Sequence, residues 1–366
     1  MKQANDTRTA RTIHKFVGLA LAFFWFLQIA RGLAIHFRTE RGDRLPGARA
    51  VMVSPAGGGT AGRRAADAGY DVSSIWISGG VEGQLDVYAA KDGGDHTLRI
   101  DSAGRMLRTR PDSQSVGDGA LYETMKAFHQ TLLAGDTGQA IVGVSGLFLV
   151  FSIVMGLVAG WRSKAMGRSI VRRPARLVSG QANLLGWHRF LGYWLAIPLL
   201  ALAVSGVMLA FADPLKDMAG VSAPSVSAQD SLGTIDAAGA VAKALDHIPG
   251  SRFTAIDMPG ETGVYRIRMH APGEIARSYG ATAIYLDRSG RLVRVEDART
   301  KRGADAIFNA LYPFHTGQVL GIGGRIAAFL CGVGALVMLV LAMTAWARST
   351  RRRPTQRSRA PVRDSN

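Results

Sequence analysis

The sequence predicts a membrane protein of mixed class: a four-helix transmembrane bundle made of two parallel repeats, with two exported α+β domains. Three observations carry this prediction. Four segments are long and apolar enough to cross a bilayer, three short segments account for most of the net positive charge, and the second half of the chain repeats the first. Hydrophobic residues make up 48% of the 366 residues, and the mean hydropathy of +0.11 is high for a soluble protein.

The four apolar segments have the length that a bilayer requires, which is about 20 residues for a helix. They run roughly over 16–37, 140–161, 189–212 and 322–346. The first follows a basic leader, as a signal peptide does. However, its apolar run is longer than that of a signal peptide and no clear small-residue cleavage site follows it, so we expect a retained span.

The net positive charge is concentrated in three segments. Residues 1–15, residues 162–189 and the tail after Ala347 together hold 18 Lys and Arg against two Asp, which accounts for nearly all of the net charge of +17. Four alternating spans place these segments on one side, and the positive-inside rule makes that side the cytoplasm. Segments near 38–139 and 213–321 are then exported. Because topology explains the basicity, we expect no nucleic-acid partner.

An internal repeat organises the chain. The motif "HKFVGLALAF" from His14 returns as "HRFLGYWLAI" from His188, at an offset of 174. In the exported segments, "LRIDSAGRMLR" (98–108) returns as "IYLDRSGRLVR" (284–294), at an offset of 186. Each copy consists of a span, an exported segment and a second span, so both copies start on the same side and are parallel.

Each exported segment is expected to form an α+β domain. In the second copy, 235–248 has helical spacing, 263–270 alternates as a strand, and 282–297 is a hairpin. The first copy contains three strand-like stretches, but its helix is weakly marked and Gly57-Gly58-Gly59 suggests a loop. The difference between the two offsets predicts an insertion in the second copy, at 271–280.

These features divide the chain into eight parts. They are the leader and first span (1–37), the first exported domain (38–126), a histidine-containing segment with the second span (127–161), a basic cytoplasmic loop (162–188), the third span (189–212), the second exported domain (213–312), a histidine-containing segment with the fourth span (313–347) and a basic tail (348–366).

Five of the eight histidines lie at or near span ends, where imidazole beside hydrocarbon is costly and indicates function. His14 and His188 begin spans one and three on the cytoplasmic side. His129 and His315, related by the offset of 186, precede spans two and four on the exported side. Symmetry-related histidines at one depth can face each other across a bundle, as two axial ligands of a haem iron do. The sequence therefore predicts two haem sites, one for each pair.

Two other interpretations of these histidines are an interfacial residue whose ring is solvated, which fits a lone histidine at a span end, and a zinc or copper site. A zinc or copper site is a poor match, because no carboxylate, thiolate or methionine accompanies the histidines. The single cysteine, Cys331, lies in the fourth apolar segment and cannot build a thiolate cluster within one chain. Gly18 and Gly192 lie four residues after His14 and His188, where they would leave room for a macrocycle or simply allow helix packing.

Two further residues of the first span are candidates for the exported-side site. His36 ends the span and has alanine at its repeat position, so it is either an alternative ligand or a residue lining the site. Its pairing with His129 or His315 stays open. Arg31 needs a partner within the span, and either a haem propionate or snorkelling to the exported face would satisfy it.

The assembled motifs resemble the PepSY-associated transmembrane family. The stretch "GWHRFLGYWLAIPLLALAVSGVMLAF" resembles its span motif, and 235–297 resembles a PepSY domain, whereas the first exported domain departs from that pattern. Nearly the whole chain is similar to the di-haem ferrisiderophore reductases of this family, of the ferrioxamine reductase type. The resemblance implies a bacterial inner-membrane protein with b-type haems held by histidines, which reduces ferric siderophores on the periplasmic side.

The electron donor and the function class have alternatives. The sequence indicates no separate cytoplasmic domain of the size that a flavin site needs, so quinol or a separate cytoplasmic reductase is the expected donor. A non-catalytic PepSY module that regulates a peptidase would use the spans only as anchors. A cytochrome b that reduces another periplasmic acceptor would differ only in substrate.

Overall fold

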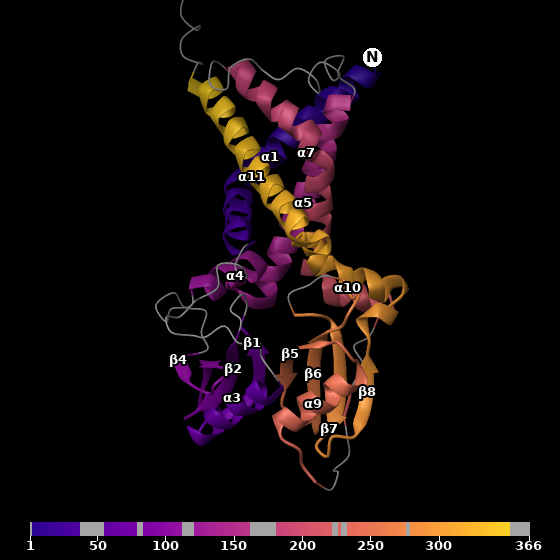
Figure 1. Ribbon diagram of the computed structural model, residues 1–366. Helices are drawn as coiled ribbons and strands as arrows, with labels where there is room; N and C mark the ends of the chain where they lie inside the picture. The colour runs from indigo at the N-terminus through magenta and orange to yellow at the C-terminus, as the bar shows by residue number, and fades with distance from the viewer. Residues whose placement is uncertain are drawn as a thin grey trace, which may run out of the picture. The chain divides into compact units, whose positions relative to one another are not determined.

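The computed structural model describes residues 2–36, 55–78, 83–111, 121–161, 181–221, 226–227, 233–275 and 279–351 (Figure 1). Parts of the predicted regions lie outside these ranges, namely 37–54, 79–82 and 112–120 of the first exported domain, 162–180 of the basic loop, 222–225, 228–232 and 276–278 of the second exported domain, and 352–366 of the tail. The chain forms two units. The helical unit comprises Met1–Ala30, Val144–Val204 and Phe329–Asn366, and the sheet unit comprises Arg31–Gly143 and Ser205–Ala328.

Four long helices confirm the four predicted spans. They are α1 (Lys2–His36), α5 (Gly135–Trp161), α7 (Gln181–Ala210) and α11 (Gly321–Arg351). Each contains a stretch long and apolar enough to cross a membrane. Large apolar side chains such as Phe23, Ile197 and Leu330 are exposed on them. A helix that is apolar on all sides is suited to lipid rather than to water.

The strands of the two segments that lie between the predicted spans join in one antiparallel sheet of eight strands, in the order β4-β3-β2-β1-β5-β6-β7-β8. The first segment supplies β1 (Asp71–Ile77), β2 (Gln84–Lys91), β3 (Gly94–Asp101) and β4 (Met106–Pro111). The second supplies β5 (Arg252–Asp257), β6 (Val264–His270), β7 (Thr282–Asp287) and β8 (Leu292–Glu296). β1 pairs with β5, where Ile75 lies opposite Ile256. The two predicted domains therefore share a sheet.

Helices α3 (Pro55–Asp67) and α9 (Ala237–His247) pack against this sheet and against each other (Figure 1). The alternating apolar residues of the strands point toward these helices and form one core with them, which includes Ala61, Val87, Val241 and Ile267. Burial of one apolar face of an antiparallel sheet explains the alternation that was visible in the sequence.

The expectation of a loop at Gly57-Gly58-Gly59 was wrong, because these glycines lie inside α3. A Cβ atom on Gly59 would lie 2.4 Å from the Cβ of Ala238 on α9. Glycine therefore lets the two helices approach closely. This packing outweighs the cost of about 0.5–1 kcal/mol that a glycine imposes within a helix.

The two hairpins that repeat in the sequence have the same turn. Gly104 follows β3 and Gly290 follows β7, each with φ of +81°, a conformation that glycine adopts without strain. Before the second turn, the Asp287 carboxylate accepts hydrogen bonds from the Ser289 hydroxyl (2.7 Å) and the Arg291 amide (2.9 Å). Burial acts to raise the pKa of Asp287, but these hydrogen bonds outweigh it and hold the pKa below its ordinary value.

Candidate functional site

His14 and His188 lie together in the helical unit, as their predicted pairing requires. His14 is on α1 and His188 on α7, with ring centres 6.1 Å apart and ring planes tilted by 51°. The Nδ1 atom of His14 lies 2.8 Å from the carbonyl oxygen of Ser152 on α5. The Nδ1 atom of His188 lies 3.0 Å from the carbonyl oxygen of Met338 on α11.

These hydrogen bonds fix which ring nitrogen carries the proton. A carbonyl oxygen can only accept, so Nδ1 of His14 and of His188 must donate. In the neutral imidazole, Nε2 then keeps its lone pair and is the nitrogen that can bind a metal. The sequence placed the two histidines, but it gave no sign of the backbone carbonyls that orient them.

The two halves of this pair correspond by the offsets found in the sequence. His14 and His188 are 174 residues apart, and their partners Ser152 and Met338 are 186 residues apart. A Cβ atom added to Gly18, one turn along α1 from His14, would meet nothing within 4 Å. A Cβ atom added to Gly192 would instead lie 3.5 Å from Cε of Met338, so Gly18 has open space beside it whereas Gly192 lies in ordinary helix packing.

His129 and His315 lie in the sheet unit, each against one span helix. His129 is near the end of α4 (Leu121–Thr131), and His315 is the last residue of α10 (Gly303–His315). A Cβ atom on Gly32 of α1 would lie 3.0 Å from Cε1 of His129, and a Cβ atom on Gly206 of α7 would lie 3.0 Å from Cε1 of His315. Gly32 and Gly206 are themselves 174 residues apart.

Arg31 lies over the ring of Phe128. Its guanidinium carbon is 3.4 Å from the centre of the Phe128 ring, which immediately precedes His129 in the chain. The Nη1 atom of Arg31 is buried and has no hydrogen-bond partner within the described part of the chain. A buried guanidinium nitrogen without an acceptor is costly and indicates a site for an anionic group.

His36 is held by α11 through a reciprocal contact. Its Nε2 atom lies 2.8 Å from the carbonyl oxygen of Arg325, and the Arg325 guanidinium donates to the carbonyl oxygen of His36. In the other half of the chain, the position of Arg325 is occupied by Gln139 and that of His36 by Ala210, and the Gln139 amide donates to the carbonyl oxygen of Ala210 at 2.8 Å. Both contacts tie the end of one span helix to the start of another.

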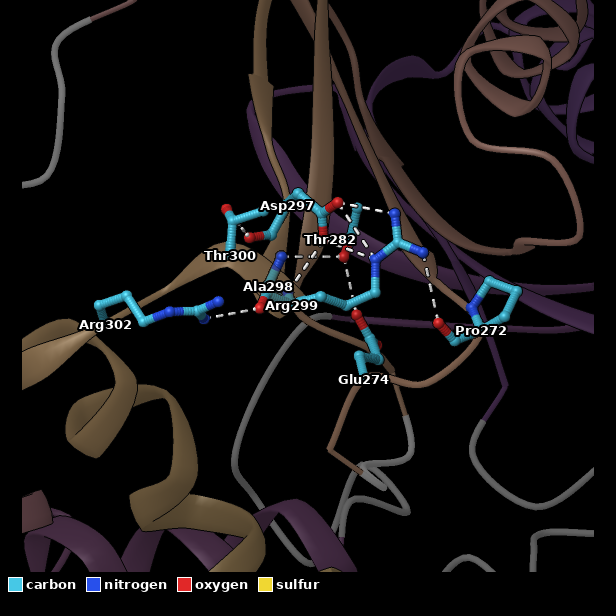
Figure 2. A network of polar contacts seen from close by, with 8 residues as sticks. All are labelled: Pro272, Glu274, Thr282, Asp297, Ala298, Arg299, Thr300 and Arg302. Atoms are coloured by element: carbon cyan, nitrogen blue, oxygen red, sulfur yellow. Dashed lines mark hydrogen bonds and ion pairs between the residues drawn. The ribbon is translucent and has the colours of Figure 1, made fainter.

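A polar network fixes the segment between β8 and α10, and so the start of the helix that carries His315 (Figure 2). Asp297 accepts hydrogen bonds from the Arg299 guanidinium (2.7 Å), and this bonding lowers the pKa of the Asp297 carboxyl. Thr282 on β7 accepts from the Ala298 amide and donates to Glu274 (2.8 Å) in the loop before β7. The sequence did not identify this network, because its members meet only in the folded chain.

Within the described residues, no group of three or more His, Cys, Asp or Glu side chains could hold a metal ion. His14 and His188 form a group of two imidazoles. Two imidazoles from opposite sides suit the iron of a porphyrin, which supplies its other ligands itself, better than they suit a bare metal ion.

Comparison with known proteins identifies the family. No significant match was found among curated proteins. The family described as PepSY-associated TM region matches residues 11–349, which include the whole sheet, all of α5 and α7, and most of α1 and α11. The chain belongs to the PepSY-associated TM region family.

Proposed function

We propose that the protein is a haem b electron conduit of the bacterial inner membrane that reduces ferric siderophores on the periplasmic side. In this proposal both chain termini lie in the cytoplasm, the sheet unit is periplasmic, and quinol or a separate reductase donates electrons on the cytoplasmic side. Bound haem would supply one-electron transfer across the bilayer to the ferric chelate, whose iron is released as Fe(II). Membership of the family supports a membrane module, and the arrangement of the histidines supports the finer assignment.

The observation that carries the proposal is the separation of His14 and His188. An imidazole nitrogen lies about 2.0–2.1 Å from a bound metal, so two rings on opposite sides of one iron have centres about 6 Å apart. The observed separation of 6.1 Å agrees with this value. The Nδ1 hydrogen bonds of both rings leave Nε2 available, which is a further requirement for ligation.

On the exported side, His129 and His315 would be the ligands and Arg31 would bind a propionate. The buried, unpartnered Nη1 of Arg31 supports this role over snorkelling, because a snorkelling guanidinium would reach water. The glycines beside the two histidine rings leave space for the rings to lie against α1 and α7. His36 uses its Nε2 atom in the contact with Arg325, so we assign it to holding the helices together rather than to ligation.

The assignment is tested by haem content. Full-length protein expressed with ample haem and purified in detergent should contain two b-type haems, and His188→Ala and His315→Ala should each remove about one. His96→Ala is the matched control, because His96 lies in β3 and bonds to Gly94 of its own strand. A control that loses haem, or ligand variants that retain both haems, would contradict the assignment.

The activity is tested separately. Protein reduced under anaerobic conditions and mixed with ferric siderophores should show reoxidation of the haem and release of Fe(II). A colourless wild-type protein would favour the non-catalytic module. If the haem is reoxidised by other periplasmic acceptors but not by ferric siderophores, the proposed electron transfer across the membrane stands and the proposed substrate is wrong.

A further inference from the structure

The group beside Nδ1 is not the same in all histidines of the candidate sites. For His188 it is a backbone carbonyl oxygen, and for His14 it is both the carbonyl oxygen of Ser152 (2.8 Å) and the hydroxyl oxygen of the same serine (3.0 Å). For His315 it is a side-chain hydroxyl, since Ser205 Oγ on α7 lies 3.1 Å from Nδ1. The hydroxyl is buried, with 3% of the residue exposed.

The chemistry of a hydroxyl differs from that of a carbonyl. A carbonyl oxygen only accepts, whereas a hydroxyl can donate to Nδ1 or accept from it. When Nε2 of His315 binds a metal, Nδ1 carries the proton and the Ser205 hydroxyl becomes its acceptor. A hydrogen-bond acceptor on the outer nitrogen orients a ligating imidazole and raises its basicity.

Ser205 is also the neighbour of Gly206, on which the His315 ring packs. Ser205 therefore positions the His315 ring by a hydrogen bond, and Gly206 provides the space in which the ring packs. In the first half of the chain, the position equivalent to Ser205 is occupied by Arg31. The hydroxyl is therefore specific to the His315 half of the exported-side pair.

We infer that Ser205 is a positioning residue for His315: its hydroxyl holds Nδ1 so that Nε2 is presented to the exported-side haem. This inference rests on the proposed function, because it takes His315 as a ligand. It adds a residue of the third span to the exported-side site and gives its hydroxyl a role that a merely structural serine would not have.

The test uses full-length protein with Ser205→Ala, Ser205→Thr and, for comparison, Ser152→Ala. Loss of an outer hydrogen bond to a ligating histidine weakens metal binding by about 10–100-fold. Ser205→Ala should therefore lose the exported-side haem about 10–100-fold more readily and raise its midpoint potential, because a less basic imidazole stabilises ferric iron less. Ser205→Thr keeps the hydroxyl and should restore both values.

Ser152→Ala should have a smaller effect on the cytoplasmic-side haem, because the Ser152 carbonyl oxygen still accepts from His14 at 2.8 Å. Retention of the other haem shows in each variant that the helices have folded. If Ser205→Ala keeps both haems at wild-type potentials, or if Ser205→Thr behaves like Ser205→Ala, the inference about Ser205 is wrong while the conduit stands. A wild-type protein without haem would overturn both.

Discussion

The close contacts of Gly32 and Gly206 with the exported-side histidines give a sharp prediction for Gly32→Ala and Gly206→Ala. In each variant the new Cβ atom would lie 3.0 Å from Cε1 of the histidine ring. Carbon atoms in contact prefer about 3.5–4.0 Å, so the ring has to move by about 0.5 Å or more. A bound group must be held within about 0.5 Å of its productive geometry.

The expected loss follows from this overlap. Overpacking of a well-packed site costs about 1–3 kcal/mol. Because each 1.4 kcal/mol corresponds to a factor of ten, haem at the exported-side pair should bind about 5- to 150-fold more weakly. The haem held by His14 and His188 should be unaffected, since its ligands lie in the helical unit.

Haem titration of each variant, followed by visible absorbance, measures the loss. Gly323→Ala on α11 is the matched control, because a Cβ atom there would meet nothing within 4 Å. Wild-type affinity at both sites in Gly32→Ala and Gly206→Ala would refute the placement of the exported-side haem at these histidines.

Three further predictions concern the stability of the helices and the sheet that surround the candidate sites. Gly59→Leu should destabilise the sheet unit by about 1–3 kcal/mol, seen as a lower Tm, because its side chain would overlap Ala238. Asp287→Asn should cost about 1–3 kcal/mol in chemical unfolding at pH 7. It should also remove the part of the pH dependence due to Asp287: stability is full above the unfolded pKa of about 3.9 and is lost as the pH falls through the lower folded pKa. His36→Ala should keep both haems but lower the Tm, since it loses the contact with Arg325.

Each of these predictions has a contradicting outcome. Gly58→Ala is the control for Gly59→Leu, because its Cβ atom would make ordinary contact with Phe253 at 3.6 Å; equal Tm values for the two variants would count against close helix packing. An unchanged pH profile in Asp287→Asn would show that the carboxylate is not held by its turn. Loss of one haem in His36→Ala would make His36 a ligand.

The spans and the repeated hairpins could be predicted from the sequence because their signals are local. An apolar run of span length, or an aspartate before a Ser-Gly turn, determines its structure from neighbouring residues. The helix over Pro55–Asp67 was not predicted, because its glycine-rich sequence is typical of a loop. Glycine is needed at Gly59 because that position packs closely against Ala238, which is far away in the sequence. The single sheet was not predicted either, since β1 finds β5 only after folding.

The candidate site shows the same division. The repeat placed His14 opposite His188, and the structure brings these rings together. The acceptors that orient them could not be predicted, because the carbonyl oxygens of Ser152 and Met338 belong to the backbone and carry no residue signature. Ser205 is visible in the sequence as a hydroxyl within an apolar span, but its role could not be predicted, because its contact with His315 forms only in the folded chain.

The central claim is that histidines from the two halves of the chain bind iron porphyrin in pairs, and the haem-to-protein ratio with its electron paramagnetic resonance spectrum tests it most directly. The account predicts two haems per chain, both low-spin with two imidazole ligands; the separation of 6.1 Å between His14 and His188 is the basis of this prediction for their pair. A protein that stays colourless after expression with ample haem, or that binds haem only in a high-spin form with one protein ligand, would contradict the account.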